Sequence, residues 1–131
     1  GMAARGVRFM FDAHLPPGLT EALRALGEPA EHVNEIFAPA TPDETWIRYA
    51  GERGWCIVSR DVNITRRPYE LKALRESEVG AFFLLPGKRS PRLCQTIQTV
   101  IRHWPELKRN AGTERRPFQY QIGERRVSRL R

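Results

Sequence analysis

The residues best suited to chemistry in this sequence are carboxylates that stand at the ends of regular elements. Asp12 directly follows a short apolar run, Asp61 follows another after one intervening residue, and Asp43 lies at a helix-start signal between them. Carboxylates placed side by side resist joint ionisation, and a divalent cation removes that penalty. Mg²⁺ prefers oxygen ligands and usually needs only one or two direct carboxylates. A cluster of these acids would hold Mg²⁺, activate a water and offset charge developing on a phosphate.

Each acid also has a purely structural interpretation. Asp12 could terminate its strand or cap the next turn, and Asp61 could be a turn residue in a polar loop, but we favour a site role for both. Asp43 could merely favour the positive end of a helix dipole, although we expect it to be a ligand. Glu44 stands where a capping box needs it, so a structural role is the better interpretation. Glu35, which follows the second expected strand, is a weaker candidate.

Polar and basic residues flank Asp61 in the sequence. Ser59 could hydrogen-bond the site, but a role as nucleophile is disfavoured because the G-x-S-x-G context is absent. Three arginines, Arg60, Arg66 and Arg67, would grip the phosphates of a polyanion. A solvated basic surface is the alternative for any one of them. No His/Cys spacing suggests zinc, and no glycine-rich phosphate loop is present.

Short apolar runs alternate with helix signals along the chain. We expect buried strands at about residues 7–11, 30–33, 55–59 and 81–85. We expect helices at about residues 17–26, from the Thr41–Glu44 start to the stop at Gly54, from Pro68 onward, and over 91–103. In the second helix, Thr41 is expected to cap and Glu44 to close a capping box. The inward stripe of the last helix is predicted to contain Leu93, Cys94, Ile97, Val100, Ile101 and Trp104.

The remaining segments read as loops and a terminal hairpin. Residues 34–40 and 60–67 are predicted to be loops, and residues 110–116 a polar linker. Residues 118–122 alternate with period two, Gly123-Glu124 can turn, and the alternation resumes over 125–130, which predicts a β-hairpin.

Alternating strands and helices predict an α/β fold with a mostly parallel sheet covered by helices on both faces. Such sheets bind ligands beyond the carboxyl ends of their strands. Asp12 and Asp61 both follow strands, so they are expected at the same end of the sheet, and their carboxylates converge if the two strands lie close together. The helix that carries Asp43 also begins at that end.

Composition limits the class of protein. With 131 residues, 40% hydrophobic and 28% charged, the chain is expected to form a single domain over residues 1–131, with a core at about 7–107 and a basic hairpin at about 117–131. The net charge of +7 attracts polyanions or an acidic partner, and residues 108–131 alone carry eight Lys/Arg against two Glu.

Location and redox chemistry can also be read from the sequence. No apolar run approaches the roughly 18–20 residues that a membrane helix needs, and no signal peptide pattern is seen. Gly1 ahead of Met2 resembles the scar of a cleaved tag, and we expect a cytoplasmic protein. The two cysteines, Cys56 and Cys94, give neither a disulfide framework nor a zinc site, and a catalytic thiol is disfavoured.

Three motifs in this order resemble those of small PIN-like proteins. Residues 11–17 (FDAHLPP) resemble the opening FDxxLP of that family. Residues 41–46 (TPDETW) resemble its central (S/T)xDE helix start, and residues 58–64 (VSRDVNI) resemble its strand-end (S/T)(R/K)DxDF segment. The later RPYELKAL at 67–74, followed by FFL, resembles the VapC-type subgroup. The resemblance spans most of residues 7–104.

The resemblance implies a ribonuclease dependent on Mg²⁺ or Mn²⁺, often the toxin of a toxin–antitoxin pair. It implies metal-binding roles for Asp12, Asp43 and Asp61. Ser59, Glu44 and Asn63 are additional candidates for the site. The expected partners are RNA, an antitoxin protein and a second copy of the chain in a homodimer. The basic hairpin would extend the RNA track or dock an acidic antitoxin.

The chain departs from the family pattern at two positions. Asn63 replaces the second acid of the DxD segment, which leaves three acids, enough for one metal ion. His14 replaces the more usual Asn of the first motif. The alternative hypothesis is therefore a weakened or inactive module that binds RNA or a protein. A phospho-acceptor signalling domain is disfavoured, because Asp12 has no adjacent acid.

Overall fold

A computed structural model of the chain describes residues 7–85 and 93–130. Its strands form one six-stranded sheet in the order β2-β1-β3-β4-β5-β6. The strands are β1 (Phe9–Phe11), β2 (Ala30–His32), β3 (Cys56–Ser59), β4 (Gly80–Leu84), β5 (Phe118–Ile122) and β6 (Val127–Arg129). All neighbouring strands are parallel except β5 and β6, which form an antiparallel hairpin. The predicted fold class is confirmed.

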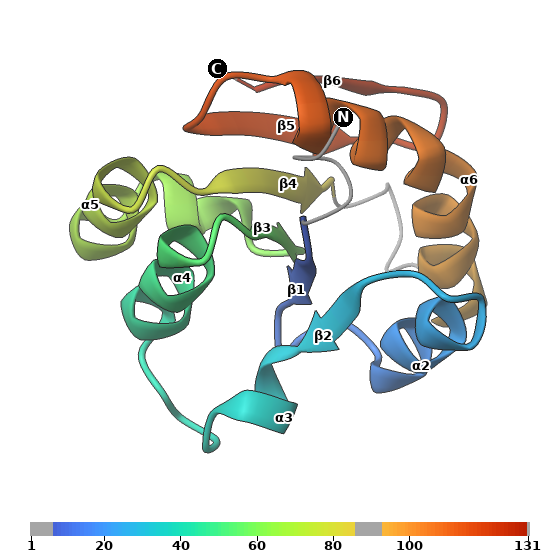
Figure 1. The fold of residues 1–131 in the computed structure, drawn as a ribbon, viewed down its shortest axis with the longest axis horizontal. Helices are drawn as coiled ribbons and strands as arrows, with labels where there is room; N and C mark the ends of the chain where they lie inside the picture. Colours follow the sequence, from blue (N-terminus) through green and yellow to red (C-terminus); the bar gives the residue numbers. More distant parts are fainter. Residues whose placement is uncertain (1–6, 86–92, 131) are drawn as a thin grey trace.

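Helices cover both faces of this sheet. They are α2 (Pro17–Ala25), α3 (Val33–Ile36), α4 (Asp43–Glu52), the short 3₁₀ helix η1 (Val62–Thr65), α5 (Pro68–Glu76) and α6 (Leu93–Thr113). Figure 1 shows α4 and α5 on one side of the sheet and α2 and α6 on the other. In the part of the chain that the structure describes, no helix is long and apolar enough to cross a membrane.

Side chains of the strands alternate between two hydrophobic cores, one on each face of the sheet. In β1, Phe9 and Phe11 enter the core under α2 and α6, whereas Met10 enters the core under α4 and α5. All three are buried, as are all residues of β3 and β4. Burial on both faces explains why these strands read as continuous apolar runs rather than alternating ones.

The hairpin is part of the same sheet. β5 lies parallel to β4, and its residues Phe118, Tyr120 and Ile122 join the core under α2 and α6. Between them, Gln119 and Gln121 face the opposite side and are half-buried. The period-two alternation therefore reflects one buried face, as predicted.

The start of α4 differs from its prediction. The helix begins at Asp43, with Pro42 as the N-cap residue and no side-chain cap. The Thr41 hydroxyl instead donates to the Ala38 carbonyl oxygen at 2.7 Å. The predicted capping box of Thr41 and Glu44 is therefore wrong, because Thr41 closes the preceding turn and is not available to the helix.

Part of the loop predicted at residues 34–40 is the short helix α3. His32 caps it: the ring nitrogen Nδ1 accepts from the Asn34 N–H at 3.2 Å. The Glu35 carboxylate accepts from the His32 N–H at 2.8 Å and completes a capping box. The cap residue is a histidine, which the usual N-cap preferences do not single out.

Helix α6 is longer than predicted and passes through Pro105 to Thr113, so the linker predicted at 110–116 is wrong over its first four residues. Buried Trp104, Leu107 and Ala111 continue the apolar stripe at helical spacing, and this packing stabilises the helix despite the proline. Residues 91 and 92, and the turn expected at 86–87, lie outside the described residues.

The predicted stripe of α6 is only partly right. Val100 and Trp104 are buried and Ile97 packs against the same core. Cys94 is exposed and Ile101 is 38% exposed, so both predictions are wrong. Nothing is described of the Leu93 side chain.

Candidate functional site

The first part of the site joins the ends of β1 and β3. These strands are adjacent and parallel, with Phe11 opposite Val58, so Asp12 and Ser59 end side by side. The Asp12 N–H donates to the Val58 carbonyl oxygen at 3.0 Å, which fixes the backbone of the acid. The Ser59 hydroxyl donates to Asp12 Oδ2 at 2.6 Å and accepts from the Asp61 N–H at 2.9 Å. One hydroxyl therefore connects two of the three predicted ligands.

The second part joins Asp61 to Asp43 through an arginine. Arg67 Nη2 donates to Asp61 Oδ2 at 2.8 Å and to Asp43 Oδ2 at 3.2 Å. Its Nε also lies 3.4 Å from a carboxylate oxygen of Glu70, three residues further along the chain. One guanidinium thus bridges carboxylates from the loop after β3 and from the start of α4.

Local structure holds both of these aspartates in place. Asp61 is the N-cap residue of η1, and its Oδ1 accepts from the Asn63 N–H at 3.1 Å. Asp43 lies in the first turn of α4, where its Oδ1 accepts from the indole N–H of Trp46 at 3.0 Å. Trp46 is itself buried in the core under α4 and α5. Each carboxylate therefore has one oxygen used for positioning and one directed to Arg67.

Asp12 is the most buried acid of the site. The residue is 3% exposed, and in the described part of the chain its side chain hydrogen-bonds only to the neutral Ser59 hydroxyl. Buried carboxylates are normally paired with a positive group or bound to a metal ion. Asp12 thus has the surroundings of a cation ligand.

Arg67 carries the compensating charge for the other two acids. The hydrogen bond that Arg67 donates to Asp61 is the main reason why the pKa of Arg67 is raised. Burial opposes this rise, and the nearby charges of Asp61, Glu70 and Asp43 reinforce it. The arginine therefore stays charged at all ordinary pH values. Its side chain is 40% exposed, so solvent screens the ion pairs.

All three aspartates of the chain belong to this network, which we call the Asp12–Asp43–Asp61 site. Other candidates lie at its edge or away from it. Glu44 is half-buried and Asn63 is exposed, as are Arg60 and Arg66.

Glu35 makes its contacts away from the site. It pairs with Arg24, whose hydrogen bond is the main cause of the lowered pKa of Glu35, and it closes the cap of α3. His14 is exposed. Neither residue takes part in the network around Asp12.

The oxygen donors of the site fit a hard cation, but the acids do not lie close enough together to surround one. Carboxylate and hydroxyl oxygens are the ligands that Mg²⁺ and Mn²⁺ take. Within residues 7–85 and 93–130, no three acids, histidines or cysteines lie close enough to form a metal-binding group on their own. Arg67 occupies the position between Asp43 and Asp61 that a cation would share. A metal ion would have to compete with this guanidinium.

Sequence reasoning missed the bridging role of Arg67 and the support from Trp46. The i,i+3 spacing of Arg67 and Glu70 was an available signal for one of the arginine's partners. Nothing in the sequence signals its contact with Asp43, which lies 24 residues earlier. Trp46 lies three residues after Asp43, on the same side of the helix, but its indole contact depends on the rotamers of both residues.

Comparison with known proteins agrees with this geometry. A family model described as a PIN-like domain matches residues 7–85, which is more than half of the chain and includes Asp12, Asp43 and Asp61. No curated protein and no solved structure matches significantly. The match covers β1 to β4 with α2 to α5 and ends before α6 and the hairpin. With its mostly parallel sheet and with these carboxylates at two strand ends and at the start of α4, the chain belongs to the PIN-like domain family, whose fold is typical of nucleases.

Proposed function

We propose that this protein is an endoribonuclease that depends on Mg²⁺ or Mn²⁺. The observation that carries the proposal is the buried Asp12 carboxylate, whose only side-chain partner among the described residues is the neutral Ser59 hydroxyl, which links it to Asp61. Asp12, Asp43 and Asp61 would hold the ion, directly or through water. When bound, the ion would activate a water and offset the charge developing on the scissile phosphate.

The residues around the acids have positioning roles in this proposal. Ser59 orients the Asp12 carboxylate and ties it to the backbone of Asp61. Trp46 orients the Asp43 carboxylate through its indole N–H. Because these partners come from β3 and α4, the oxygens are held by the packed core and not by a loose loop.

The arginines would bind the substrate's phosphates. Arg60 and Arg66 are exposed beside the site, and Arg67 already contacts two of its acids. If a cation takes over the neutralisation of Asp43 and Asp61, the Arg67 guanidinium becomes available to a phosphate. Arg67 would then serve as a counter-ion without substrate and as a phosphate contact with it.

We further propose that the protein is a VapC-type toxin with an acidic antitoxin as its partner. The net charge of +7 favours association with acidic protein segments as well as RNA. The hairpin turn exposes Arg125 and Arg126, which would form part of the antitoxin surface. Where a neighbouring gene encodes a small acidic protein, co-expression of the two followed by size-exclusion chromatography tests this part independently of cleavage.

The cleavage proposal is tested with purified protein and a structured RNA substrate. Wild type is expected to give discrete products only with Mg²⁺ or Mn²⁺, and Asp12→Asn is expected to lower the rate at least about a hundredfold because the mutant carries no charge at the buried ligand. Glu52→Gln is the matched control, since Glu52 is exposed on α4 away from the site. Circular dichroism checks that both variants fold. Equal cleavage by Asp12→Asn and wild type contradicts the proposal.

A non-catalytic PIN-like module is the second candidate, and Asn63 favours it. Its side chain is exposed at the position where the motif carries an acid, and Arg67 already neutralises two of the remaining acids. This candidate predicts salt-sensitive RNA binding without products that depend on a divalent cation. An Asn63→Asp variant that gains cleavage would identify the missing acid as the reason.

A further inference from the structure

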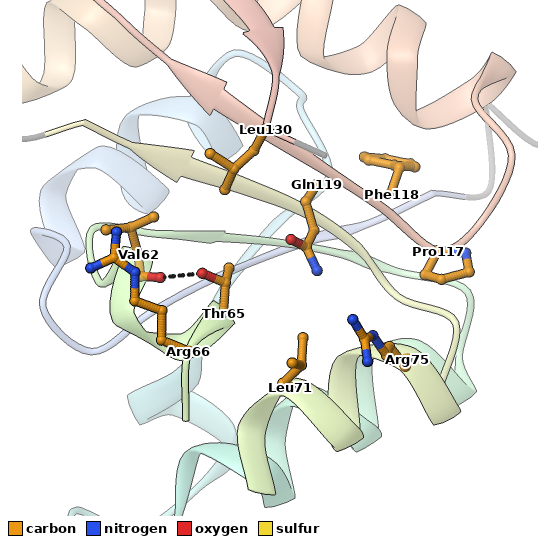
Figure 2. A pocket seen from close by; sticks show the side chains of 9 residues that line it. All are labelled: Val62, Thr65, Arg66, Leu71, Arg75, Pro117, Phe118, Gln119 and Leu130. Carbon is orange, nitrogen blue, oxygen red and sulfur yellow. Dashed lines mark hydrogen bonds between the residues drawn. The ribbon is translucent and has the colours of Figure 1, made fainter. Parts of the chain in front are cut away.

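A pocket of about 280 Å³ lies beside the Asp12–Asp43–Asp61 site, on the sheet face that α4 and α5 cover. Its lining comes from η1, α5 and the two ends of the hairpin (Figure 2). The lining residues are Val62, Thr65, Arg66, Leu71, Arg75, Pro117, Phe118, Gln119 and Leu130. Its volume is near the lower end of the range of small-ligand sites.

The pocket exists because the hairpin extends the sheet beyond its helical layer. On this face, the core under α4 and α5 is built from residues of β1, β3 and β4. β5 and β6 add Gln119, Gln121 and Ser128 to the same face, and Gln121 donates to Ser128 Oγ at 2.9 Å. The edge of α5 and the face of the hairpin thus form two adjacent walls of the pocket. The family match ends at residue 85, so this wall belongs to the part of the chain outside it.

The lining combines positive charge, one amide and an apolar surface. Figure 2 shows the Arg75 guanidinium and the Gln119 amide directed toward the same space from opposite sides, with Leu71 beside them. Arg66 lies at the side formed by η1. Within the described residues, no acid lines the pocket, and the side chains of Arg66 and Arg75 make no hydrogen bond or ion pair. The two charges are therefore available to an anion, unlike that of Arg67.

The pocket and the acid site share η1 as a common wall. Asp61 caps this helix, and the next residue, Val62, lines the pocket. At the other end of η1, Arg66 lines the pocket while Arg67 contacts Asp61 and Asp43. A chain that leaves the acids and crosses η1 would thus enter the pocket within a short distance.

We propose that this pocket binds one nucleotide of a single-stranded RNA, next to the segment held at the acids. Arg75 and Arg66 contact its flanking phosphates, the base lies against Leu71 and Leu130, and the Gln119 amide hydrogen-bonds the base edge. Arginine charge with an apolar wall suits a nucleotide, because phosphate contacts supply affinity and the base buries its face. The inference rests on the proposed ribonuclease function for the choice of RNA as the ligand.

The test measures RNA binding in the Asp12→Asn background, so that cleavage does not consume the probe. A fluorescent single-stranded oligonucleotide is titrated at several salt concentrations. Arg75→Gln is expected to weaken binding about fivefold and to lower the slope of log K against log salt by about 0.7, the value for one phosphate contact on a single strand. Lys72→Gln is the matched control, because it removes one charge from an exposed position of the same helix outside the pocket.

A second variant separates the pocket from general charge attraction. Gln119→Ala keeps the charge and is expected to lower affinity about threefold, unequally among homopolymers of the four bases, with an unchanged salt slope. Equal losses for Arg75→Gln and Lys72→Gln, together with no effect of Gln119→Ala, overturn the pocket proposal.

The outcome for the pocket is distinct from the outcome for the nuclease. Wild type that binds RNA through Arg75 and Gln119 without cutting it supports the pocket and contradicts the proposed catalysis. If wild type cuts RNA, and Arg75→Gln and Gln119→Ala cut it with the same efficiency, the result supports the nuclease and contradicts the pocket. An acidic peptide that competes equally well for wild type and Gln119→Ala would identify a protein surface instead and overturn the nucleotide assignment.

Discussion

At the scale of single residues, the site depends on which groups neutralise which charges. Asp43 and Asp61 share one arginine, whereas Asp12 is buried against a hydroxyl. The negative charges of Asp43 and Asp61 are therefore neutralised by Arg67 without any ligand, whereas no positive side chain in the described part of the chain pairs with Asp12. This asymmetry makes Asp12 the most informative position for substitution and Arg67 the residue whose removal should most increase the need for a cation.

Replacing Arg67 with Ala should make stability more dependent on Mg²⁺. Without the guanidinium, Asp43 and Asp61 repel each other, and a cation that binds only the folded state raises its stability by mass action. Thermal unfolding with and without millimolar Mg²⁺ measures the effect, and the rise in Tm should be larger in Arg67→Ala than in wild type. Arg48→Ala, which breaks the surface pair with Glu76, is the control of equal charge change. The same Mg²⁺ response in all three proteins would exclude a cation site between these acids.

The two cysteines should differ in reactivity and in their effect on alkaline stability. Burial raises the pKa of the Cys56 thiol from its ordinary value of 9.0 to about 12, whereas Cys94 is exposed. A thiol reagent at pH 8 should therefore modify one cysteine in the folded protein and two after unfolding. As pH rises from 9 toward 12, the unfolded chain releases a proton that folded Cys56 retains, so stability should fall over this window. Cys56→Ala should reduce that alkaline slope, measured by urea unfolding at pH 8 and 10.

At the scale of elements, close packing between strands and the hairpin decides where the pocket wall stands. Gly80 begins β4 opposite Phe118 of β5. A Cβ on Gly80 would lie 2.3 Å from Phe118 Cζ and 2.9 Å from Cys56 Sγ, distances that real contacts do not reach. The absence of a side chain at this position allows the Phe118 ring to lie over the strand.

Gly80→Ala should destabilise the protein by about 1–3 kcal/mol, because the new methyl group overpacks a core that already holds Phe118 and Cys56. Gly18→Ala is the matched control: it lies in α2 with open space around its Cβ position and should be neutral or stabilise by up to about 1 kcal/mol. Urea unfolding of both variants measures the difference. Similar stability of the two variants would show that Phe118 does not pack on Gly80 as described.

At the scale of the whole molecule, residues beyond the family match complete the sheet and one of its two cores. The match ends at residue 85, yet Phe118, Tyr120 and Ile122 belong to the same core as Phe9 and Phe82. Helix α6 contributes Trp104, whose ring centroid lies 4.6 Å from that of Phe9. The acid site is carried by one half of this sheet and the pocket wall by the other.

Removing the hairpin should therefore abolish cooperative folding. A chain that ends at residue 114 lacks β5 and β6 and exposes the apolar edge of β4 and the inner face of α6. We expect loss of the thermal transition by circular dichroism and binding of a hydrophobic dye. The full-length variant Arg125→Gln/Arg126→Gln is the control, because it removes charge from the exposed turn and leaves the buried residues in place. A cooperative transition in the truncated chain would show that the hairpin is an appendage.

The alternation of buried runs and helices, the mostly parallel sheet and the sheet end that carries Asp12 and Asp61 could all be predicted from the amino-acid sequence. These features follow from local periodicity and from connections between consecutive elements. The sequence also predicted the hairpin. Three features became known from the folded chain alone: β1 and β3 are neighbours, Ser59 and Arg67 join the three acids, and α6 continues through Pro105. These features rest on contacts between residues far apart in the chain, which local patterns do not encode. The same holds for the pocket, whose walls meet only when residues 62–75 and 117–130 pack together.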